Sequence, residues 1–497
     1  MRLYELFERA GLKAPADVEN VDVKNIVTDS RRVQKDSLFV CIRGTHTDGH
    51  EYIDSAIEKG ASVIVAEQVR DACVGGAAAF IMLDNTRKVA ALLYNAFFGD
   101  PVKNLKIIGV TGTNGKTSVT YLLYEIFRRS GFRTGLIGTV CRLSADGADL
   151  SPKNEDPTAN MTTPDPDELY RELAEMVKDG VEYVFMEVSS HSLALGKVEA
   201  IEFDSAVFTN LTQDHLDFHG SMDEYYKAKS RLFEKSRRAL INIGGEYGKR
   251  LALECPCPFF TCSVTEGDFR ALDVKGWGTG GVSYILKSPY GELWIESPMM
   301  GSIAVENTLT AGALALTYGI SPKTVSAAIA EIQGAAGRME KVDIETDEFS
   351  VIIDYAHTPD ALEKLLRTVR SIRPTGGHII LVFGCGGERD GGKRKLMGGI
   401  ASRFSDLVIV TSDNSRGEDP DAIISDILKG IDKEKPYTVI KDRREAIARA
   451  VLDAKYGDVV VLAGKGHEKY EINAEGKHPF DETKIVKSAF ALRQERK

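Results

Sequence analysis

The chain has 497 residues, of which 43% are hydrophobic and 27% are charged, and its formal net charge is −10. This usage is typical of folded globular proteins and excludes a disordered, collagen-like or coiled-coil chain. At roughly 150 residues per domain, the length predicts about three domains. Because the charge balance is acidic and no long basic run occurs, we do not expect nucleic acid as a partner.

Targeting signals and cysteine usage predict a cytoplasmic protein. The first 13 residues mix acidic and basic side chains without an apolar core, so we expect no signal peptide. No apolar stretch reaches the ~18 residues that a membrane-spanning helix needs, so we expect no membrane insertion. The seven scattered cysteines fit reduced thiols. Three of them have the spacing C-x-C-x4-C with no histidine nearby, which we interpret as small buried thiols rather than a zinc site: Cys255, Cys257 and Cys262.

Residues 1–100 are predicted to form a small amino-terminal α/β domain. Apolar runs at 37–42 and 61–67 predict strands, and the segment 50–60 between them has the periodicity of an amphipathic helix. A further helix is predicted over 86–99, because Gly99 ends the pattern and Pro101 follows it. Asp100 and Pro101 are the expected linker to the next domain.

Residues 101–335 are predicted to form a central mononucleotide-binding domain. A strand over 105–110 runs into a glycine-rich loop and then into a helix over 118–130. Three near-continuous apolar runs predict strands of a mostly parallel sheet that is covered on both faces: 181–188, 205–210 and 238–243. The segment 283–297 predicts a hairpin turning at Pro289, Tyr290 and Gly291. Two helices close the block, and the second begins at Ser321 and Pro322.

Residues 336–497 are predicted to form a carboxyl-terminal, Rossmann-like, doubly wound domain. Strands alternate with helical stretches, which is typical of a parallel sheet with helices on both faces. The predicted strands are 350–356, 378–384, 406–412, 437–440 and 458–464. The fold class is therefore α/β with three domains.

The loop between strand 105–110 and the following helix has the composition of a phosphate-binding loop. Its glycines allow backbone N–H groups to approach phosphate oxygens at the start of a helix. Lys116 can reach the β- and γ-phosphates, and the Thr117 hydroxyl can bind Mg²⁺. Val110 stands where the usual pattern has its first glycine, so the sequence matches the pattern only in part. The order of strand, glycine-rich loop and helix matches fully. The predicted ATP-binding residues here are Gly112, Thr113, Asn114, Gly115, Lys116, Thr117 and Ser118.

Two polar residues follow later strands of the same predicted sheet. Glu187 ends an apolar strand, where phosphoryl-transfer sites place a metal-binding carboxylate. His215 follows the strand 205–210 and could complete a metal shell or bind phosphate as a neutral imidazole. A solvated glutamate and a capping or core histidine are the alternative interpretations.

With these motifs in place, the chain resembles the Mur ligases along essentially its whole length. The matching stretches are TDSRRVQKDSLFVCIRG, GVTGTNGKTS, MTTPDP, MEVSSHSL, FTNLTQDHLDFHG, YYKAKSRLF, GAAGRMEKVD, DYAHTPDAL, VFGCGGERDGGKRKLM, SDNSRGEDP and AGKGHE. The resemblance implies an ATP- and Mg²⁺-dependent amide-bond-forming ligase of cytoplasmic peptidoglycan precursor synthesis, acting as a monomer. It implies that a carboxylate is activated as an acyl phosphate and then captured by an amine.

The resemblance also assigns roles that spacing alone does not. It implies that Lys116, Glu187, His215 and Lys229 are catalytic, and that Thr117, Glu187, His215 and a carbamylated Lys229 bind metal. From the residues alone, Lys229 reads as a solvated helix lysine. Further ATP contacts are implied for Asn307, Arg338, Asp354 and His357, and Ala304 stands where the family usually has asparagine.

Nucleotide-sugar contacts follow from the same resemblance. It implies that UDP-MurNAc-dipeptide is bound by Ser30, Thr45, His46, Thr47, Thr162, Thr163, Ser189 and Lys197. Hydroxyl and loop N–H groups suit pyrophosphate and sugar oxygens. Lys197 replaces the usual arginine, so a single ammonium takes the place of a guanidinium that can form two parallel hydrogen bonds.

The segment SDNSRGEDP resembles the DNPR signature of ligases that add meso-diaminopimelate. Diaminopimelate differs from lysine by a second carboxylate, which a guanidinium can pair in a bidentate way. The implied amino-acid contacts are Arg389, Asp413, Asn414, Ser415, Arg416, Gly464 and Glu468. The expected reaction adds meso-2,6-diaminopimelate to the D-glutamate carboxylate of UDP-MurNAc-L-Ala-D-Glu. Ser415 replaces the proline of the signature, and L-lysine remains the alternative amino acid.

Two further interpretations remain open. A folylpolyglutamate synthetase or another Mur-type synthetase would share the mechanism, although SDNSRGEDP and AGKGHE argue against it. A catalytically silent paralogue that acts as a binding subunit would explain the substitutions at Lys197, Ala304, Lys395 and Ser415. The retained Lys116, Thr117, Glu187, His215 and Lys229 argue against the silent paralogue.

Overall fold

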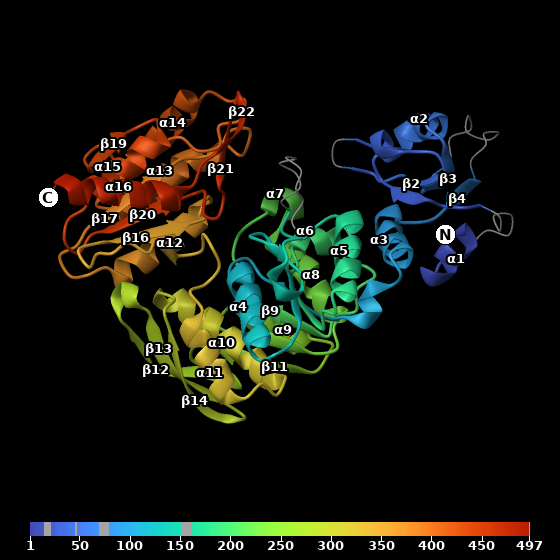
Figure 1. Ribbon diagram of the computed structural model, residues 1–497, viewed down its shortest axis with the longest axis horizontal. Helices are drawn as coiled ribbons and strands as arrows, with labels where there is room; N and C mark the ends of the chain where they lie inside the picture. Colours follow the sequence, from blue (N-terminus) through green and yellow to red (C-terminus); the bar gives the residue numbers. More distant parts are fainter. Residues whose placement is uncertain (14–20, 45–46, 69–78, 151–160, 497) are drawn as a thin grey trace. The chain divides into compact units, whose positions relative to one another are not determined.

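The computed structural model describes residues 1–13, 21–44, 47–68, 79–150 and 161–496. The chain divides into two compact units, residues 1–262 and residues 263–497, and each is described by itself. Both units are built from sheets and helices of the α/β class (Figure 1), as the sequence predicts. No helix in the described ranges is long and apolar enough to cross a membrane.

The first unit begins with a four-stranded parallel sheet in the order β1-β2-β3-β4. Its helices pack their apolar faces against the sheet, and the two strands and two helices predicted from the sequence are confirmed to within a few residues. The elements are β1 (Asn25–Val27), β2 (Ser37–Val40), β3 (Ala61–Ala66), β4 (Ala79–Met82), α1 (Leu3–Arg9), α2 (Ile53–Glu58) and α3 (Thr86–Phe97). The short strands β1 and β4 and helix α1 were not predicted.

The second sheet of this unit is mostly parallel, in the order β11-β10-β9-β5-β8-β6-β7, and only β7 is antiparallel to its neighbour. Its strands are β5 (Lys106–Thr111), β6 (Thr134–Ile137), β7 (Arg142–Leu143), β8 (Tyr183–Glu187), β9 (Ser205–Phe208), β10 (Ala239–Asn242) and β11 (Phe259–Ser263). Its helices are α4 (Lys116–Arg129), α5 (Pro166–Lys178), α6 (Ser190–Ala194), α7 (Leu216–His219), α8 (Met222–Glu234) and α9 (Glu246–Glu254). Because β5 lies between β9 and β8, the carboxyl ends of these three strands meet at one edge, where parallel α/β sheets bind ligands.

The second unit starts with an antiparallel meander of β12 (Phe269–Gly276), β13 (Val282–Ser288) and β14 (Gly291–Ser297). The hairpin predicted over 283–297 is thus confirmed, with Pro289 and Tyr290 at its turn. Helices α10 (Gly301–Thr317) and α11 (Pro322–Glu331) follow. Helix α11 begins at proline with Ser321 as its cap, since the Ser321 hydroxyl accepts the Thr324 N–H.

A six-stranded sheet in the order β15-β16-β20-β17-β18-β19 forms the rest of the second unit, and only β15 is antiparallel. Its strands are β15 (Glu340–Lys341), β16 (Ser350–Asp354), β17 (Ile379–Phe383), β18 (Leu407–Val410), β19 (Tyr437–Val439) and β20 (Val459–Ala463), and a small hairpin of β21 (Tyr470–Asn473) and β22 (Gly476–Pro479) follows. Its helices are α12 (Pro359–Ile372), α13 (Gly392–Phe404), α14 (Pro420–Leu428), α15 (Arg443–Asp453) and α16 (Glu482–Arg496).

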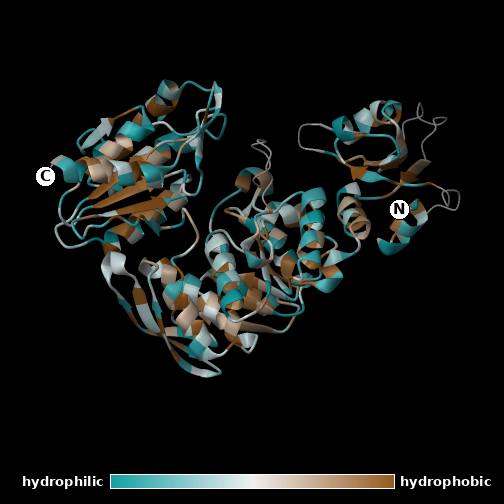
Figure 2. Ribbon diagram, viewed as in Figure 1, coloured by the Kyte–Doolittle hydropathy of each residue, from teal (hydrophilic) through white to brown (hydrophobic). Residues whose placement is uncertain are grey.

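The central strands β16, β17, β18 and β20 bury both faces, so they read as apolar runs and appear brown in Figure 2. Leu381 and Phe383 of β17 join one core with α12, α13 and α14. Ile380 and Val382 of the same strand join a second core with α15 and α16. The alternation along one strand therefore confirms the predicted doubly wound sheet.

A buried ion pair ties the last helix to the strand ends of this sheet. Arg443 Nε donates to Glu482 Oε1 at 2.8 Å, and the two side chains are 0% and 2% exposed. Arg443 also donates to Ser412 O at 3.4 Å and Ala463 O at 3.0 Å, which follow β18 and end β20. These bonds give the buried guanidinium a carboxylate partner and two backbone acceptors, which offset the cost of removing its charge from water.

A buried carboxyl on α5 gives a stability prediction. Glu172 is 4% exposed and accepts from Arg142 Nη1 at 2.8 Å, and burial raises the pKa of its carboxyl from 4.5 to about 7. Because the folded protein holds this proton more tightly, the contribution of Glu172 to stability is complete below pH 4.5 and is lost as the pH rises through 7. We expect Glu172→Gln to remove this loss, which amounts to about 3 kcal/mol at most. Thermal unfolding of the unmodified protein and of Glu172→Gln at pH 5 and at pH 8 measures this loss. A difference in Tm between the two proteins that is the same at both pH values would contradict the assignment.

Candidate active site

The loop of residues 112–115 joins β5 to α4 and depends on two glycines. Gly112 has φ 151° and Gly115 has φ 84°, both in the region that favours glycine. A Cβ on Gly112 would lie 2.0 Å from Thr209 Oγ1, just after β9, so a larger residue would displace the neighbouring strand end. The loop is thus fitted to the end of β9.

Hydrogen bonds fix the same loop against Asn210. The Thr113 N–H donates to Asn210 O at 2.9 Å, and the Asn114 N–H donates to Asn210 Oδ1 at 3.0 Å. Lys116, Thr117 and Ser118 lie in the first turn of α4. Because the first N–H groups of a helix have no partner within it, this end can bind an anion such as phosphate.

Two lysines converge on one carbonyl oxygen of this loop. Lys116 Nζ donates to Gly112 O at 3.0 Å, and Lys229 Nζ, on α8, donates to the same oxygen at 2.8 Å. Lys229 is 1% exposed, and burial and the neighbouring Lys116 hold its pKa well below the usual 10.5. A buried lysine with a lowered pKa is present more often as the neutral amine, which is the nucleophilic form.

Glu187 lies at the carboxyl end of β8 and faces the start of α4. Thr117 Oγ1 donates to Glu187 Oε2 at 3.0 Å, and the Thr139 N–H donates to Oε1 at 2.8 Å. A Cβ on Gly138 would lie 2.6 Å from Glu187 Oε1, so the close approach requires glycine. The predicted pair Thr117 and Glu187 is therefore brought into direct contact.

These oxygens match the ligand preference of Mg²⁺. Within the described ranges, no group of three or more His, Cys, Asp or Glu side chains could hold a metal ion. Mg²⁺ at nucleotide sites usually takes one or two carboxylates together with phosphate oxygens and water. The Thr117 hydroxyl and the Glu187 carboxylate fit an ion of this kind that is bound together with a nucleotide.

His215 precedes α7 in the left-handed conformation, with φ 53°. Its ring centroid lies 6.0 Å from that of Tyr225, and Lys229 Nζ lies 4.7 Å from the same Tyr225 ring. Tyr225 therefore connects His215 with Lys229. The sequence interpretation missed Tyr225, although it stands in the quoted stretch YYKAKSRLF.

His191 is a second residue that the sequence interpretation missed. It lies in α6, four residues after Glu187, and its ring centroid is 4.8 Å from that of His215. Burial and the neighbouring His215 lower the pKa of His191 to about 4, so its imidazole is neutral at neutral pH. The signal was present in MEVSSHSL, directly after the strand that ends in Glu187.

Three residues predicted to bind the nucleotide sugar meet beside Glu187. Thr163 Oγ1 donates to Glu187 O at 2.8 Å, and the Ser189 N–H donates to Thr163 Oγ1 at 3.1 Å. The hydroxyls of Thr162 and Thr139 lie 3.0 Å apart. Through Glu187, which also accepts from Thr117, these residues are connected to the start of α4 by hydrogen bonds.

The remaining nucleotide-sugar residues are placed as follows. Lys197 Nζ pairs with Asp165 Oδ1 at 2.7 Å, so its ammonium already has a carboxylate partner. Ser30 and Thr47 follow the carboxyl ends of the neighbouring strands β1 and β2. Thr45 and His46 lie outside the described residues.

In the second unit, Asp354 ends β16 and organises the predicted nucleotide residues there. Asp354 Oδ2 accepts the Met339 N–H, and Oδ1 accepts the Ala356 N–H, both at 2.8 Å. Burial raises the pKa of the Asp354 carboxyl, and Arg338 opposes this shift. The Arg338 guanidinium lies over the Tyr355 ring, with its central carbon 4.9 Å from the ring centroid.

His357 and Asn307 differ in how they relate to this group. The His357 ring lies 4.6 Å from the Tyr355 ring, and its Nδ1 lies 2.8 Å from Tyr355 O, so it belongs to the same cluster. Asn307 is 6% exposed within α10. None of the described hydrogen bonds joins it to Arg338, Asp354 or His357.

The predicted amino-acid residues follow the carboxyl ends of β17, β18 and β20, which are neighbours in the sheet. Asn414 Nδ2 donates to Glu468 Oε2 at 2.7 Å, which joins the loop after β18 to the loop after β20. Gly464 has φ 116°, and a Cβ there would lie 2.6 Å from Asp413 Oδ2. Burial and Asp413 raise the pKa of Glu468. Burial also acts to raise the pKa of Asp413, but the Lys465 and Arg443 cations outweigh it and hold that pKa below its usual value.

Arg416 is anchored to the backbone of the same group. Its φ is 54°, its Nη1 donates to Gly387 O at 3.0 Å and to Asn414 O at 3.3 Å, and its N–H donates to Ile472 O. The neighbouring Ser415 is 4% exposed, whereas Arg389 is exposed on the loop after β17. The structure thus brings Asn414, Arg416 and Glu468 together and leaves Arg389 at the rim.

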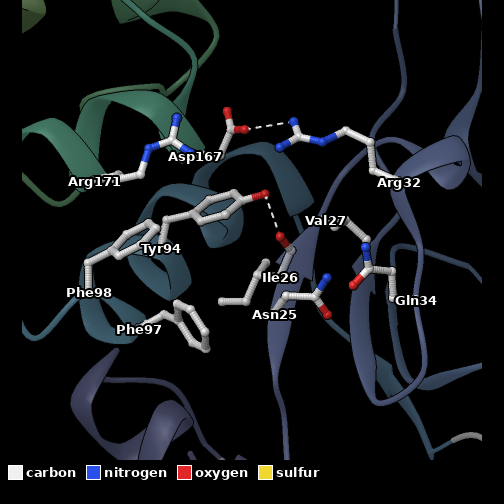
Figure 3. A pocket seen from close by; sticks show the side chains of 10 residues that line it. All are labelled: Asn25, Ile26, Val27, Arg32, Gln34, Tyr94, Phe97, Phe98, Asp167 and Arg171. Atoms are coloured by element: carbon white, nitrogen blue, oxygen red, sulfur yellow. Dashed lines mark hydrogen bonds and ion pairs between the residues drawn. The ribbon is translucent and has the colours of Figure 1, made fainter. Parts of the chain in front are cut away.

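A separate pocket of about 310 Å³ lies between β1, α3 and α5 (Figure 3). An ion pair between Arg32 Nη1 and Asp167 Oδ2 at 2.9 Å crosses it, and the Tyr94 hydroxyl donates to Ile26 O at 3.1 Å. None of the residues predicted to bind substrate lines this pocket. Its ion pair instead ties the segment that carries Ser30 to α5, which follows Thr162 and Thr163.

The three clustered cysteines differ in burial. Cys262 is 0% exposed in β11, as the sequence predicts, whereas Cys255 and Cys257 are half-buried. The sulfurs of Cys255 and Cys257 lie 3.7 Å apart.

Three family descriptions match successive parts of the chain. "Mur ligase family, catalytic domain" matches residues 22–98, "Mur ligase middle domain" matches residues 110–315, and "Mur ligase, glutamate ligase domain" matches residues 337–466. The second of these ranges contains the phosphate loop, Glu187 and Lys229.

Curated relatives and a solved structure match nearly the whole chain. UDP-N-acetylmuramoyl-L-alanyl-D-glutamate–2,6-diaminopimelate ligase of Clostridioides difficile is 45% identical over 94% of this chain and 95% of its own length. The ligase of the same name from Clostridium tetani is 41% identical over 98% of this chain and 99% of its own length. A solved structure of a ligase with that name has a TM-score of 0.70 and 32% identity, and the match covers 99% of this chain and 100% of that one.

Proposed function

Because the chain belongs to the Mur ligase family, we propose that it joins meso-2,6-diaminopimelate to the D-glutamate carboxylate of UDP-MurNAc-L-Ala-D-Glu at the expense of ATP. The names of the relatives at 45% and 41% identity support this reaction. The observation that carries it is the group of Asn414, Arg416 and Glu468, where the Asn414 amide donates to the Glu468 carboxylate and the Asn414 backbone carbonyl accepts from the Arg416 guanidinium. That pairing suits an amino acid whose distal end carries both a carboxylate and an ammonium.

Activation of the carboxylate is assigned to the first unit. The substrate carboxylate attacks the γ-phosphorus of ATP, which forms an acyl phosphate and releases ADP. Lys116 and the N–H groups at the start of α4 offset the repulsion between the two anions. Thr117 and Glu187 hold Mg²⁺, which supplies positive charge to the phosphate oxygens when bound.

Amide formation follows from capture of the acyl phosphate. The neutral amine of the amino acid attacks the acyl carbon, a proton leaves the nitrogen, and inorganic phosphate departs as the amide bond forms. Asn414, Arg416 and Glu468 position the amino acid, with Asp413, Ser415, Gly464 and Arg389 completing the loops around it. Arg416 is half-buried, and its guanidinium gains no carboxylate partner when L-lysine binds, so the site discriminates against L-lysine.

Lys229 is assigned as a carbamate. Its neutral amine adds CO₂ and loses a proton, which converts a buried cation into an anionic oxygen ligand beside the loop. The lowered pKa of Lys229 supports this step, because only the neutral amine reacts. His215 completes this catalytic group.

The other predicted contacts complete the proposal. Gly112, Thr113, Asn114, Gly115, Ser118, Asn307, Arg338, Asp354 and His357 bind ATP. Ser30, Thr45, His46, Thr47, Thr162, Thr163, Ser189 and Lys197 bind the nucleotide sugar. The domains are residues 1–100 for the UDP-sugar, 101–335 for ATP and 336–497 for the amino acid. The enzyme acts as a cytoplasmic monomer without nucleic-acid partners.

Phosphate release tests the proposal directly. Pure protein is incubated with ATP, Mg²⁺, UDP-MurNAc-L-Ala-D-Glu and either diaminopimelate or L-lysine. We expect phosphate and a tripeptide product with diaminopimelate, and at least about tenfold less with L-lysine. Release with L-lysine alone would assign the lysine-adding reaction, and no release with either would favour the silent paralogue.

A further inference from the structure

Lys465 occupies the centre of the group formed by the loops after β18 and β20. Its side chain is 0% exposed. Its Nζ donates to Asn414 Oδ1 at 2.8 Å and to Tyr470 O at 2.9 Å, and it lies 3.5 Å from Asp413 Oδ1 and 4.0 Å from Glu468 Oε2. Because a buried ammonium is costly unless it is paired and hydrogen-bonded, these contacts hold Lys465 in one position.

This lysine determines which way the Asn414 amide points. Asn414 Oδ1 accepts from Lys465 Nζ and from the Ile472 N–H at 2.9 Å, which uses both of its lone pairs. A flipped amide would set its NH₂ group against two donors. The Nδ2 group is therefore directed to Glu468 Oε2, at 2.7 Å.

The same arrangement also fixes Glu468 relative to Arg416. The Asn414 side chain orients the Glu468 carboxylate, and the backbone carbonyl of the same residue accepts from Arg416 Nη1 at 3.3 Å. Asn414 thus links Glu468, which can accept from a substrate ammonium, to Arg416, which can donate to a substrate carboxylate. Lys465 holds Asn414 from the buried side.

We propose that Lys465 is a positioning residue that determines amino-acid specificity, because it sets the spacing between Glu468 and Arg416 through the Asn414 amide. The substrate class it selects is an amino acid whose distal end carries both an ammonium and a carboxylate. The inference rests on the proposed function and adds a residue that would not itself touch the substrate.

The Lys465→Met variant tests the inference, because methionine has similar length but neither charge nor donor. We expect the KM for diaminopimelate to rise about tenfold or more, the effect of small misplacements in a binding site. The KM for ATP is expected to stay the same, and the preference for diaminopimelate over L-lysine to fall. Lys465→Gln, which keeps an N–H donor for Asn414 Oδ1, is expected to show a smaller rise in KM.

Glu482→Gln is the matched control. Glu482 pairs with buried Arg443, which bonds the same strand ends but not Asn414 or Glu468. We expect this variant to lower Tm without changing the KM for diaminopimelate. If Lys465 had a purely structural role, its variants would likewise lower Tm and leave the KM for diaminopimelate unchanged, which would contradict the inference.

A double-mutant cycle completes the test. In an Asn414→Ala background, Lys465→Met is expected to add a much smaller rise in KM than in the unmodified enzyme, because the hydrogen bond to Asn414 is gone and only the longer pair with Glu468 at 4.0 Å remains. Additive effects, or an unchanged KM in Lys465→Met, would overturn the inference. Failure of the unmodified enzyme to use diaminopimelate would instead overturn the proposed function, so the two failures are distinguishable.

Discussion

Replacing Lys229 with alanine is expected to lower kcat by ~10²–10³-fold, the scale observed when one group that stabilises developing charge is removed. Lys229 is 1% exposed, and its Nζ shares the Gly112 carbonyl with Lys116. As a carbamate it would supply an anionic oxygen at this place, and alanine removes it. Steady-state phosphate release at saturating substrates measures the loss.

Two further measurements separate a carbamate from an ordinary lysine. Formate or acetate is expected to restore part of the activity of Lys229→Ala, because a small carboxylate can occupy the space left by the side chain. The unmodified protein in ¹³C-labelled bicarbonate is expected to show a carbamate carbon signal that Lys229→Ala lacks. Lys227→Ala is the matched control, since Lys227 is exposed on the same helix and pairs with Asp223 and Glu224 on that helix. Full activity of Lys229→Ala would contradict the assignment.

Replacing Arg416 with alanine is expected to lower kcat/KM for diaminopimelate by about 100-fold or more, the effect of truncating one partner of a desolvated charge pair. The Arg416 guanidinium is held by Gly387 O and Asn414 O through Nη1, so its direction is set before an amino acid binds. The KM for ATP is expected to remain unchanged, because Arg416 is not among the nucleotide residues.

The charge and the shape of Arg416 can be tested separately. Arg416→Lys keeps the positive charge but loses the planar fork, so we expect an intermediate loss for diaminopimelate. Turnover of L-lysine, which lacks the distal carboxylate, is expected to change little in either variant. Equal losses for diaminopimelate and ATP would show that Arg416 supports the fold rather than the specificity.

Much of the fold was predictable because its strands are buried on both faces. The run 378–384 predicted β17 without any periodicity, since residues that alternate between two cores are all apolar. The phosphate loop was predictable for a different reason. Its glycines are required by backbone geometry, and Gly112 has no room for a side chain beside Thr209.

Other features lay beyond the sequence because they depend on contacts between distant segments. Lys229 reads as an exposed helix lysine, and only the fold shows that its ammonium is buried on Gly112 O, 117 residues away. Thr139 binds Glu187 from the loop after β6, and no local pattern marks it. Lys465 was within a quoted motif, but its effect on Asn414 depends on the pairing of two strand ends.

The pair of Arg443 and Glu482 joins helix α16 to the segments at the ends of β18 and β20, so its contribution is to the stability of the fold. Removal of Glu482 and of the residues after it would leave the buried Arg443 guanidinium without its carboxylate partner. That guanidinium bonds Ser412 and Ala463, the residues that directly precede Asp413 and Gly464. Trimming that reaches Glu482 is therefore expected to lower Tm, and trimming between Glu482 and Val486 also removes buried side chains of the second core.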